Sequence, residues 1–142
     1  MDCYIIVIRM PTAEEVIELR NLVNWGVPNI NSMELGLKNS LFGVCAIYNG
    51  VTVETIRVIG DGSTCFYIQD IIVNPDHQRN GIGQAMMKEV MNYIAENACE
   101  GAVVGLMSAK GKEEFYEKFG FCMRPNEHFG HGMMMFWNMG KN

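Results

Sequence analysis

Apolar positions along this chain follow two different rhythms, and each predicts a different kind of element. Short apolar runs with the length and composition of buried or half-buried strands occupy residues 3–9, 41–48, 51–60, 64–73 and 101–107. Three- and four-residue spacing, which is typical of a helix with one buried face, appears over residues 12–23, 31–39 and 81–97. The pattern therefore predicts a mixed α/β fold in which a sheet is flanked by helices.

Cap and turn residues set the expected boundaries of these elements. Thr12 and Glu15 have the spacing of a capping box for the first helix, and Asn31 and Glu34 have it for the second. The Asn49-Gly50 pair between two apolar runs is a strong signal for a tight hairpin. We therefore expect two helices early in the chain, followed by an antiparallel meander.

The last third of the chain predicts smaller elements. A short helix should end near Phe119, with Gly120 as its left-handed cap, and two brief strands should follow at 121–123 and 133–137. The expected order is then β-α-α-β-β-β-α-β-α-β-β. No repeat or linker interrupts it, so we expect one domain over residues 1–142.

A glycine-rich turn, Gln78-Arg79-Asn80-Gly81-Ile82-Gly83, joins the apolar run that ends at Val73 to the longest predicted helix. Glycines let backbone N–H groups approach a ligand, and the start of a helix carries partial positive charge, so this turn suits a phosphate group. A P-loop is excluded because Gly83 is followed by Gln84 rather than Lys. A dinucleotide fingerprint is excluded because Met86 occupies the place of its third glycine.

Two motifs together resemble the GNAT superfamily of acyl-CoA-dependent N-acyltransferases. One is the Gln-x-x-Gly-x-Gly turn, which Ile71, Val73 and Pro75 introduce in the spacing Ile-x-Val-x-Pro. The other is the stretch Phe-Tyr-Glu-Lys-Phe-Gly-Phe at residues 115–121, about thirty residues later. The predicted element order is also that of the GNAT fold, which has a mostly antiparallel sheet flanked by helices.

The resemblance implies direct transfer of an acetyl group from acetyl-CoA to a primary amine of a small molecule. A bulged strand that splays from its neighbour would pair with the pantetheine arm, and the glycine turn would hold the pyrophosphate. The matching cofactor-binding positions here are Ile71, Ile72, Val73, Gln78, Arg79, Asn80, Gly81, Ile82, Gly83 and Gln84. A backbone N–H at or beside Val73 would stabilise the tetrahedral oxyanion.

Two side chains are candidates for proton transfer. Tyr116 occupies the position of the family's proton donor to the departing thiolate, and the pKa of a phenol is close enough to that of a thiol for this step. Asp70 is the acidic residue of its strand and is a candidate general base. Strand alternation, however, places Asp70 on the face opposite to Tyr67 and Gln69, so Asp70 has the alternative of orienting substrate or holding a structural hydrogen bond.

Acceptor recognition is expected from loops. By resemblance these are the loop that contains Trp25 and Pro28 and the segment that contains His128 and His131. One departure from the family pattern is Ala109, where many members have an asparagine that contacts CoA. Two further functions stay open, namely acetylation of protein or peptide amines and a CoA-binding sensor without turnover.

Composition limits the partners, the location and the metal sites that we expect for this chain. The formal charge is −5 and no basic run occurs, which disfavours nucleic acid and anionic membranes as partners. No apolar stretch reaches the length of a membrane span and the N-terminus lacks a basic leader, so we expect a cytoplasmic protein. Five scattered cysteines without a Cys-x-x-Cys pair predict no metal site and mostly buried thiols. Family analogy also suggests a homodimer.

Overall fold

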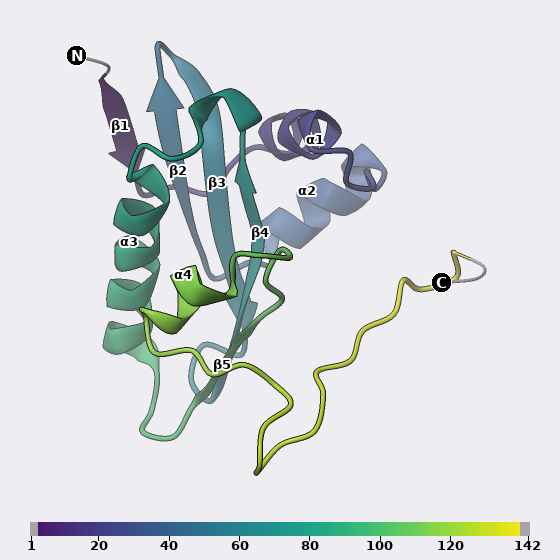
Figure 1. The fold of residues 1–142 in the computed structure, drawn as a ribbon. Helices are drawn as coiled ribbons and strands as arrows, with labels where there is room; N and C mark the ends of the chain where they lie inside the picture. Colours follow the sequence, from purple (N-terminus) through teal and green to yellow (C-terminus); the bar gives the residue numbers. More distant parts are fainter. Residues whose placement is uncertain (1–2, 140–142) are drawn as a thin grey trace. The chain divides into compact units, whose positions relative to one another are not determined.

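The computed structural model describes residues 3–139, which divide between Met107 and Ser108 into two compact units. The first unit holds a five-stranded sheet in the order β1-β2-β3-β4-β5 (Figure 1). Its strands are β1 Tyr4–Val7, β2 Phe42–Tyr48, β3 Val51–Gly60, β4 Cys65–Val73 and β5 Val103–Leu106. Neighbouring strands are antiparallel except for β4 and β5, which are parallel. The expected α/β fold is confirmed, with a mixed sheet.

Helices cover both faces of this sheet (Figure 1). On one face, α1 (Ala13–Leu22) and α2 (Ile30–Lys38) enclose an apolar cluster that includes Ile72 of β4. On the other face, α3 (Ile82–Asn97) buries its four-residue stripe against β2 and β3, and Tyr93 stacks on Phe42. The sheet is therefore a rigid layer between two apolar cores, and β4 contributes to both.

Local signals in the sequence explain most element boundaries. Thr12 forms the predicted capping box, because its side chain accepts from the Glu15 N–H while the Glu15 carboxylate accepts from the Thr12 N–H. The Asn49-Gly50 hairpin is also confirmed, with both residues at positive φ as a type I′ turn requires. The cap predicted for α2 at Asn31 is wrong. The Asn29 side chain accepts from the Ser32 N–H instead, so the helix begins before Asn31.

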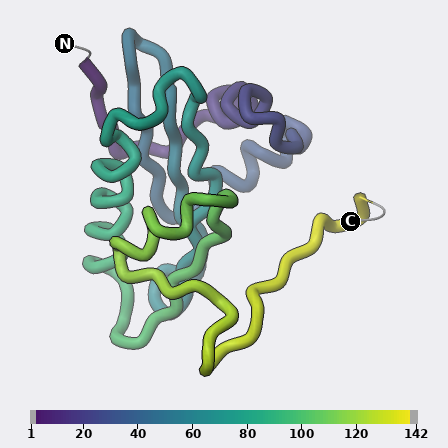
Figure 2. Tube along the Cα trace, in the orientation of Figure 1, coloured from purple at the N-terminus to yellow at the C-terminus, as the bar shows by residue number. Residues whose placement is uncertain are grey.

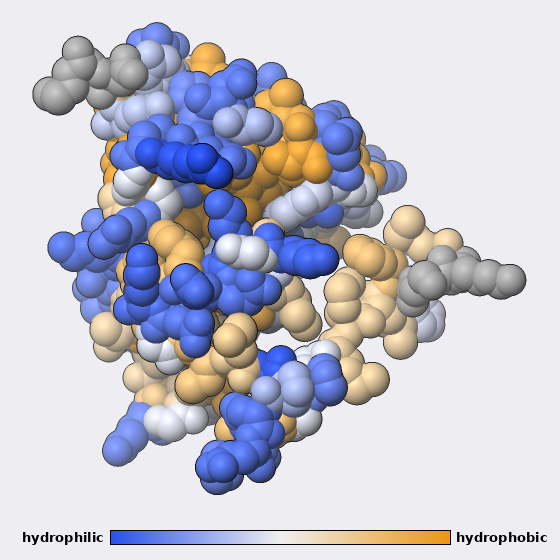
Figure 3. Space-filling view, viewed as in Figure 1, coloured by the Kyte–Doolittle hydropathy of each residue, from blue (hydrophilic) through white to orange (hydrophobic). Residues whose placement is uncertain are grey.

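The second unit contains one short helix, α4 (Glu113–Glu117), followed by Gly120 at φ +97. The two predicted strands at 121–123 and 133–137 are wrong, because both segments are irregular. An apolar run forms a strand only where a neighbouring strand satisfies its backbone, whereas the Phe121 N–H is donated to the Tyr116 carbonyl. The segment 133–137 exposes its large apolar side chains to solvent (Figure 3).

The cysteines also differ from expectation. Only Cys45, in the middle of β2, is buried, whereas Cys3, Cys65, Cys99 and Cys122 are exposed. Cys65 is the first residue of β4 and Cys99 follows the end of α3, and such positions lie at the margins of a core. Among residues 3–139, no helix has both the length and the apolar character needed to cross a bilayer.

Gly60, the last residue of β3, has a backbone conformation that only glycine tolerates. Its φ is +147, and a Cβ atom built there would lie 2.1 Å from the Cys65 carbonyl oxygen. We therefore expect Gly60→Ala to lower the free energy of unfolding by about 2 kcal/mol or more. Chemical denaturation measures this loss. Gly26→Ala is the matched control, since a Cβ there meets nothing within 4 Å, and equal stability of the two variants would contradict the prediction.

Candidate functional site

The second half of β4 has a partner on only one side. β5 pairs with β4 from Cys65 to Ile68 and ends at Leu106, whereas β3 continues alongside β4 as far as Val73. Residues 69–73 therefore present an edge without a ladder partner inside the sheet of the first unit. An extended ligand with amide groups can hydrogen-bond to such an edge as an added strand does.

A β-bulge interrupts this open half at Asp70. Thr55 of β3 is paired with Ile72 and Arg57 is paired with Gln69, so Asp70 and Ile71 together oppose the single residue Ile56. Asp70 has a φ of +55, which is uncommon for a residue other than glycine. Bulges bend a strand and redirect its side chains, and they are frequent beside active sites.

The bulge also changes the face on which Asp70 lies. Its carboxylate contacts Arg57, whose backbone is paired with Gln69, and its charge acts on Tyr67. Asp70 therefore shares the α1 side of the sheet with Tyr67 and Gln69. The alternation that placed Asp70 on the opposite face is wrong, because a bulged residue resets the two-residue repeat of a strand.

Two arginines hold the Asp70 carboxylate. Arg20 Nη1 of α1 lies 2.6 Å from Oδ1, and Arg57 Nε of β3 lies 2.9 Å from Oδ2. The Asp70 side chain is 1% exposed, and those of Arg20 and Arg57 are 17% and 12% exposed. Because each carboxylate oxygen accepts a charge-assisted hydrogen bond, this geometry favours the alternative in which Asp70 orients the site. Burial and the Asp70 charge together raise the pKa of Tyr67.

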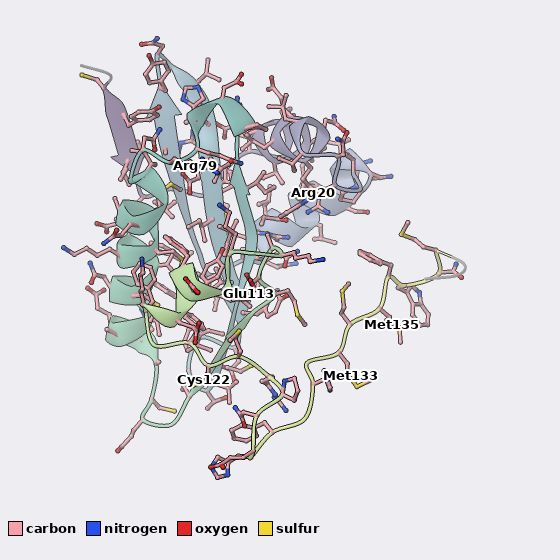
Figure 4. All side chains as sticks on the ribbon, viewed as in Figure 1. Arg20, Arg79, Glu113, Cys122, Met133 and Met135 are labelled. Carbon is pink, nitrogen blue, oxygen red and sulfur yellow. The ribbon has the colours of Figure 1, made fainter. Side chains whose placement is uncertain are left out.

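Arg20 connects the bulge to the predicted acceptor loop. Its Nε donates to the Gly26 carbonyl at 2.7 Å, and its guanidinium lies 5.8 Å from the centre of the Trp25 ring, on the α1 side of the sheet (Figure 4). Trp25 and Asp70 are therefore linked through one side chain. Pro28 is exposed in the same loop, beyond these contacts.

The glycine turn leaves the start of α3 open to an anion. Gly81 is the N-cap at φ +82, it has no side chain that could cap the helix, and the first turn of the helix holds no acidic residue. The N–H groups of that turn and the helix dipole therefore favour a negatively charged ligand. Arg79, at φ +65, is exposed in the turn just before the helix (Figure 4).

Asn80 ties this turn to the first strand. Its Nδ2 donates to the Tyr4 hydroxyl at 2.7 Å and to the His77 carbonyl at 2.8 Å, while its Oδ1 accepts from the Ile82 N–H. The Tyr4 hydroxyl also lies 2.8 Å from His77 Nδ1. The chain after β4 thus crosses the end of the sheet to reach β1 before it enters α3 (Figure 2).

The remaining candidates belong to the second unit. Tyr116 lies in α4, where its ring packs edge-on against Phe115 and Phe121. His128 is exposed and lies 3.1 Å from a carboxylate oxygen of Glu127, and His131 is also exposed. No group of three His, Cys, Asp or Glu residues with the arrangement of a metal site occurs between residues 3 and 139.

Several residues of the site were not singled out by sequence reasoning. Arg57 and Glu54 are charged residues inside the apolar run of β3, and that placement was a usable signal. Arg20, Tyr4 and His77 carry no comparable signal, because their roles depend on segments that only the fold brings together.

Glu54 is the buried acid of β3 that lies opposite Val73, the last residue of the open half of β4. It is 2% exposed, and burial raises its pKa to about 7. A carboxyl group that changes charge near neutrality therefore lies one strand away from the open edge.

Comparison with known proteins gives the family. The acetyltransferase (GNAT) domain family matches residues 40–122, which is more than half of the chain. The chain belongs to the GNAT acetyltransferase family. Its matched region spans the bulge, the glycine turn and α4.

Solved GNAT structures and curated relatives agree. A probable acetyltransferase from meticillin-resistant Staphylococcus aureus is 31% identical, with a TM-score of 0.85, and the match covers 95% of this chain and all of that one. A GNAT-family acetyltransferase from Streptococcus pneumoniae is 29% identical, with a TM-score of 0.77 and coverage of 94% and 98%. The uncharacterized N-acetyltransferase ycf52 of Pyropia yezoensis is 25% identical over 87% of this chain and 70% of its own length.

The buried acid Glu54 predicts a pH dependence of stability. The pKa of Glu54 is about 7 in the folded chain and 4.5 ordinarily, so the folded chain holds the proton more tightly than the unfolded chain does. The stability that this proton contributes to the fold is therefore fully present below pH 4.5 and is lost as the pH rises through 7. Relative to Glu54→Gln, the wild type should lose about 3 kcal/mol of unfolding free energy between pH 4 and pH 8.

Urea denaturation across that pH range measures the difference. Glu96→Gln, an exposed position on α3, is the control and should follow the wild-type profile. If the Glu54→Gln and wild-type profiles ran parallel, Glu54 would not titrate in this window.

Proposed function

We propose that this GNAT protein transfers an acetyl group from acetyl-CoA directly to a primary amine of a small molecule. The observation that carries the proposal is the combination of an open strand edge at residues 69–73 with a helix that begins soon after it, at Ile82, and has no acidic residue in its first turn. These two features suit the two chemically different parts of CoA. The edge suits the amides of the pantetheine arm, and the helix start suits the pyrophosphate.

The binding residues divide accordingly. Backbone groups of Ile71, Ile72 and Val73 pair with the arm, and N–H groups from Gln78 to Gln84 receive the pyrophosphate, with Asn80 shaping the turn and Arg79 adding charge. CoA supplies the activated thioester when it is bound. A backbone N–H at the end of β4, at or beside Val73, would supply the hydrogen bond that stabilises the developing oxyanion.

In this proposal Tyr116 transfers a proton and Asp70 positions the site. Tyr116 donates a proton to the departing thiolate, as the resemblance of residues 115–121 implies. Asp70 holds the bulge through its two arginines, and the amine either arrives neutral or loses its proton through water.

Trp25, which Arg20 connects to the bulge, borders the acceptor site, and His128 and His131 remain proposed acceptor contacts. The protein acts in the cytoplasm without nucleic acid or membrane partners, and a homodimer is its proposed assembly.

The decisive experiment is acetyl-CoA-dependent release of free thiol with a panel of amines. The panel contains polyamines, arylamines, amino sugars, amino acids and lysine peptides. Turnover of one small-molecule class supports the proposal, whereas turnover of lysine peptides alone would replace it with a protein acetyltransferase. Tight acetyl-CoA binding without any turnover would indicate a CoA sensor.

The Asn80 contacts predict a specific effect on cofactor affinity. Asn80→Ala removes the hydrogen bonds to Tyr4 and His77 that shape the turn, so acetyl-CoA affinity should fall about tenfold. Isothermal titration calorimetry measures the affinity. Asn97→Ala, at the opposite end of the same helix, is the matched control and should bind like the wild type. Equal affinities of the two variants would show that Asn80 does not shape the binding turn.

Tyr116→Phe tests the proton donor. Without the phenolic hydroxyl the thiolate must leave unprotonated, so kcat should fall by a factor of about 10² to 10⁴ while acetyl-CoA affinity stays within about twofold. Steady-state kinetics and calorimetry give the two quantities. Phe115→Leu, which alters the neighbouring ring but no hydroxyl, controls for packing. Unchanged kcat in Tyr116→Phe would remove this residue from the mechanism.

A further inference from the structure

The ion-pair cluster at the bulge carries an excess positive charge. Two guanidinium groups, of Arg20 and Arg57, share the single carboxylate of Asp70, and within residues 3–139 neither arginine has another ion-pair partner. All three side chains are more than four-fifths buried. A net charge of +1 in such a largely buried place is costly, because water hydrates the charge only in part and no second anion offsets it.

Part of the hydrogen-bonding capacity of these arginines is also unused. Arg20 donates to Asp70 and Gly26, and Arg57 donates to Asp70 and Ser40, while each guanidinium has five N–H groups. No buried side-chain nitrogen within residues 3–139 lacks a hydrogen-bond partner. Any remaining guanidinium nitrogen without a partner therefore reaches solvent, where a ligand can contact it.

The cluster lies where an acceptor would be. Asp70 is in the open half of β4, beside the backbone that is proposed to hold the thioester, and Arg20 contacts the loop of Trp25. The pyrophosphate turn follows the other end of this half-strand, so the cluster is separate from the phosphates of the cofactor. A guanidinium fork matches the geometry of a carboxylate or phosphate group.

We infer that Arg20 and Arg57 bind an anionic group of the acceptor, so that the preferred acceptor is a small amine that also carries a carboxylate or a phosphate. The anion neutralises the cluster and uses the free guanidinium N–H groups, while the amine reaches toward the open edge of β4. This inference rests on the proposed function and adds the chemical class of the acceptor. It also explains how a chain with a net charge of −5 can bind an anionic substrate, since the excess positive charge is local.

The first test compares amines that differ only in the anionic group. Ethanolamine and propylamine have no anionic group and are called the neutral probes for that reason, O-phosphoethanolamine carries a phosphate, and β-alanine carries a carboxylate. We expect kcat/KM to be about tenfold or more higher for at least one anionic probe, and the two anionic probes tell phosphate from carboxylate. Calorimetric binding of the same four probes to the CoA-loaded protein gives a readout that does not need turnover.

Charge-matched variants assign the effect to the cluster. Arg57→Gln lowers the net charge of the cluster to zero, so the ratio of kcat/KM for anionic probes to kcat/KM for neutral probes should fall toward one. Arg57→Lys keeps the charge and should keep most of the preference.

The outcomes separate the two proposals. If acetyl-CoA does not bind, the proposed function fails. If acetyl-CoA binds and the wild type treats neutral and anionic probes alike in turnover and binding, only the anionic-acceptor inference fails. A preference that survives unchanged in Arg57→Gln would likewise overturn the assignment to this cluster.

Discussion

The arrangement of the site depends on one buried carboxylate. Asp70 has a left-handed backbone conformation that costs a non-glycine residue about 1–3 kcal/mol, and such a conformation persists only where its surroundings impose it. Here the surroundings are two guanidinium groups, one from α1 and one from β3, which hold both carboxylate oxygens. The bulge they maintain lies just beyond the point where β4 loses its pairing with β5.

The opposite end of the same half-strand has a different kind of support. Asn80 and Tyr4 hold the glycine turn by uncharged hydrogen bonds, and α3 contributes its dipole without an acidic residue in its first turn. Ion pairs therefore support the half-strand at Asp70, which Arg20 links to Trp25. Uncharged hydrogen bonds support the glycine turn that follows Val73. This division leaves the partial positive charge of the helix available to a ligand, since no local side chain neutralises it.

Sequence reasoning succeeded for most local determinants, although the cap it placed at Asn31 was wrong. The capping box at Thr12, the Asn49-Gly50 hairpin and the strand-turn-helix unit around Gly81 each depend on neighbours within a few residues. It failed where a partner distant in sequence decides the outcome. The run 133–137 has strand-like composition but forms no strand within the described residues 3–139, and the face of Asp70 depends on a register shift against β3. The pairing of Arg20 with Asp70 spans fifty residues and has no local signature.

The short length of β5 has a consequence for the behaviour of the protein in solution. An unpaired strand edge is a template on which other chains can add, and proteins usually protect such edges with charge, prolines or covering segments. In residues 69–73 the edge is apolar apart from Gln69 and the inward-held Asp70. A ligand that pairs with this edge would protect it as a covering strand does. At a concentration of one hundred times its Kd it would also add about 2.7 kcal/mol to the stability of the fold. If CoA is that ligand, as proposed, the strand edge would be covered only while CoA is bound, and the protein would resist aggregation best while it is supplied with CoA.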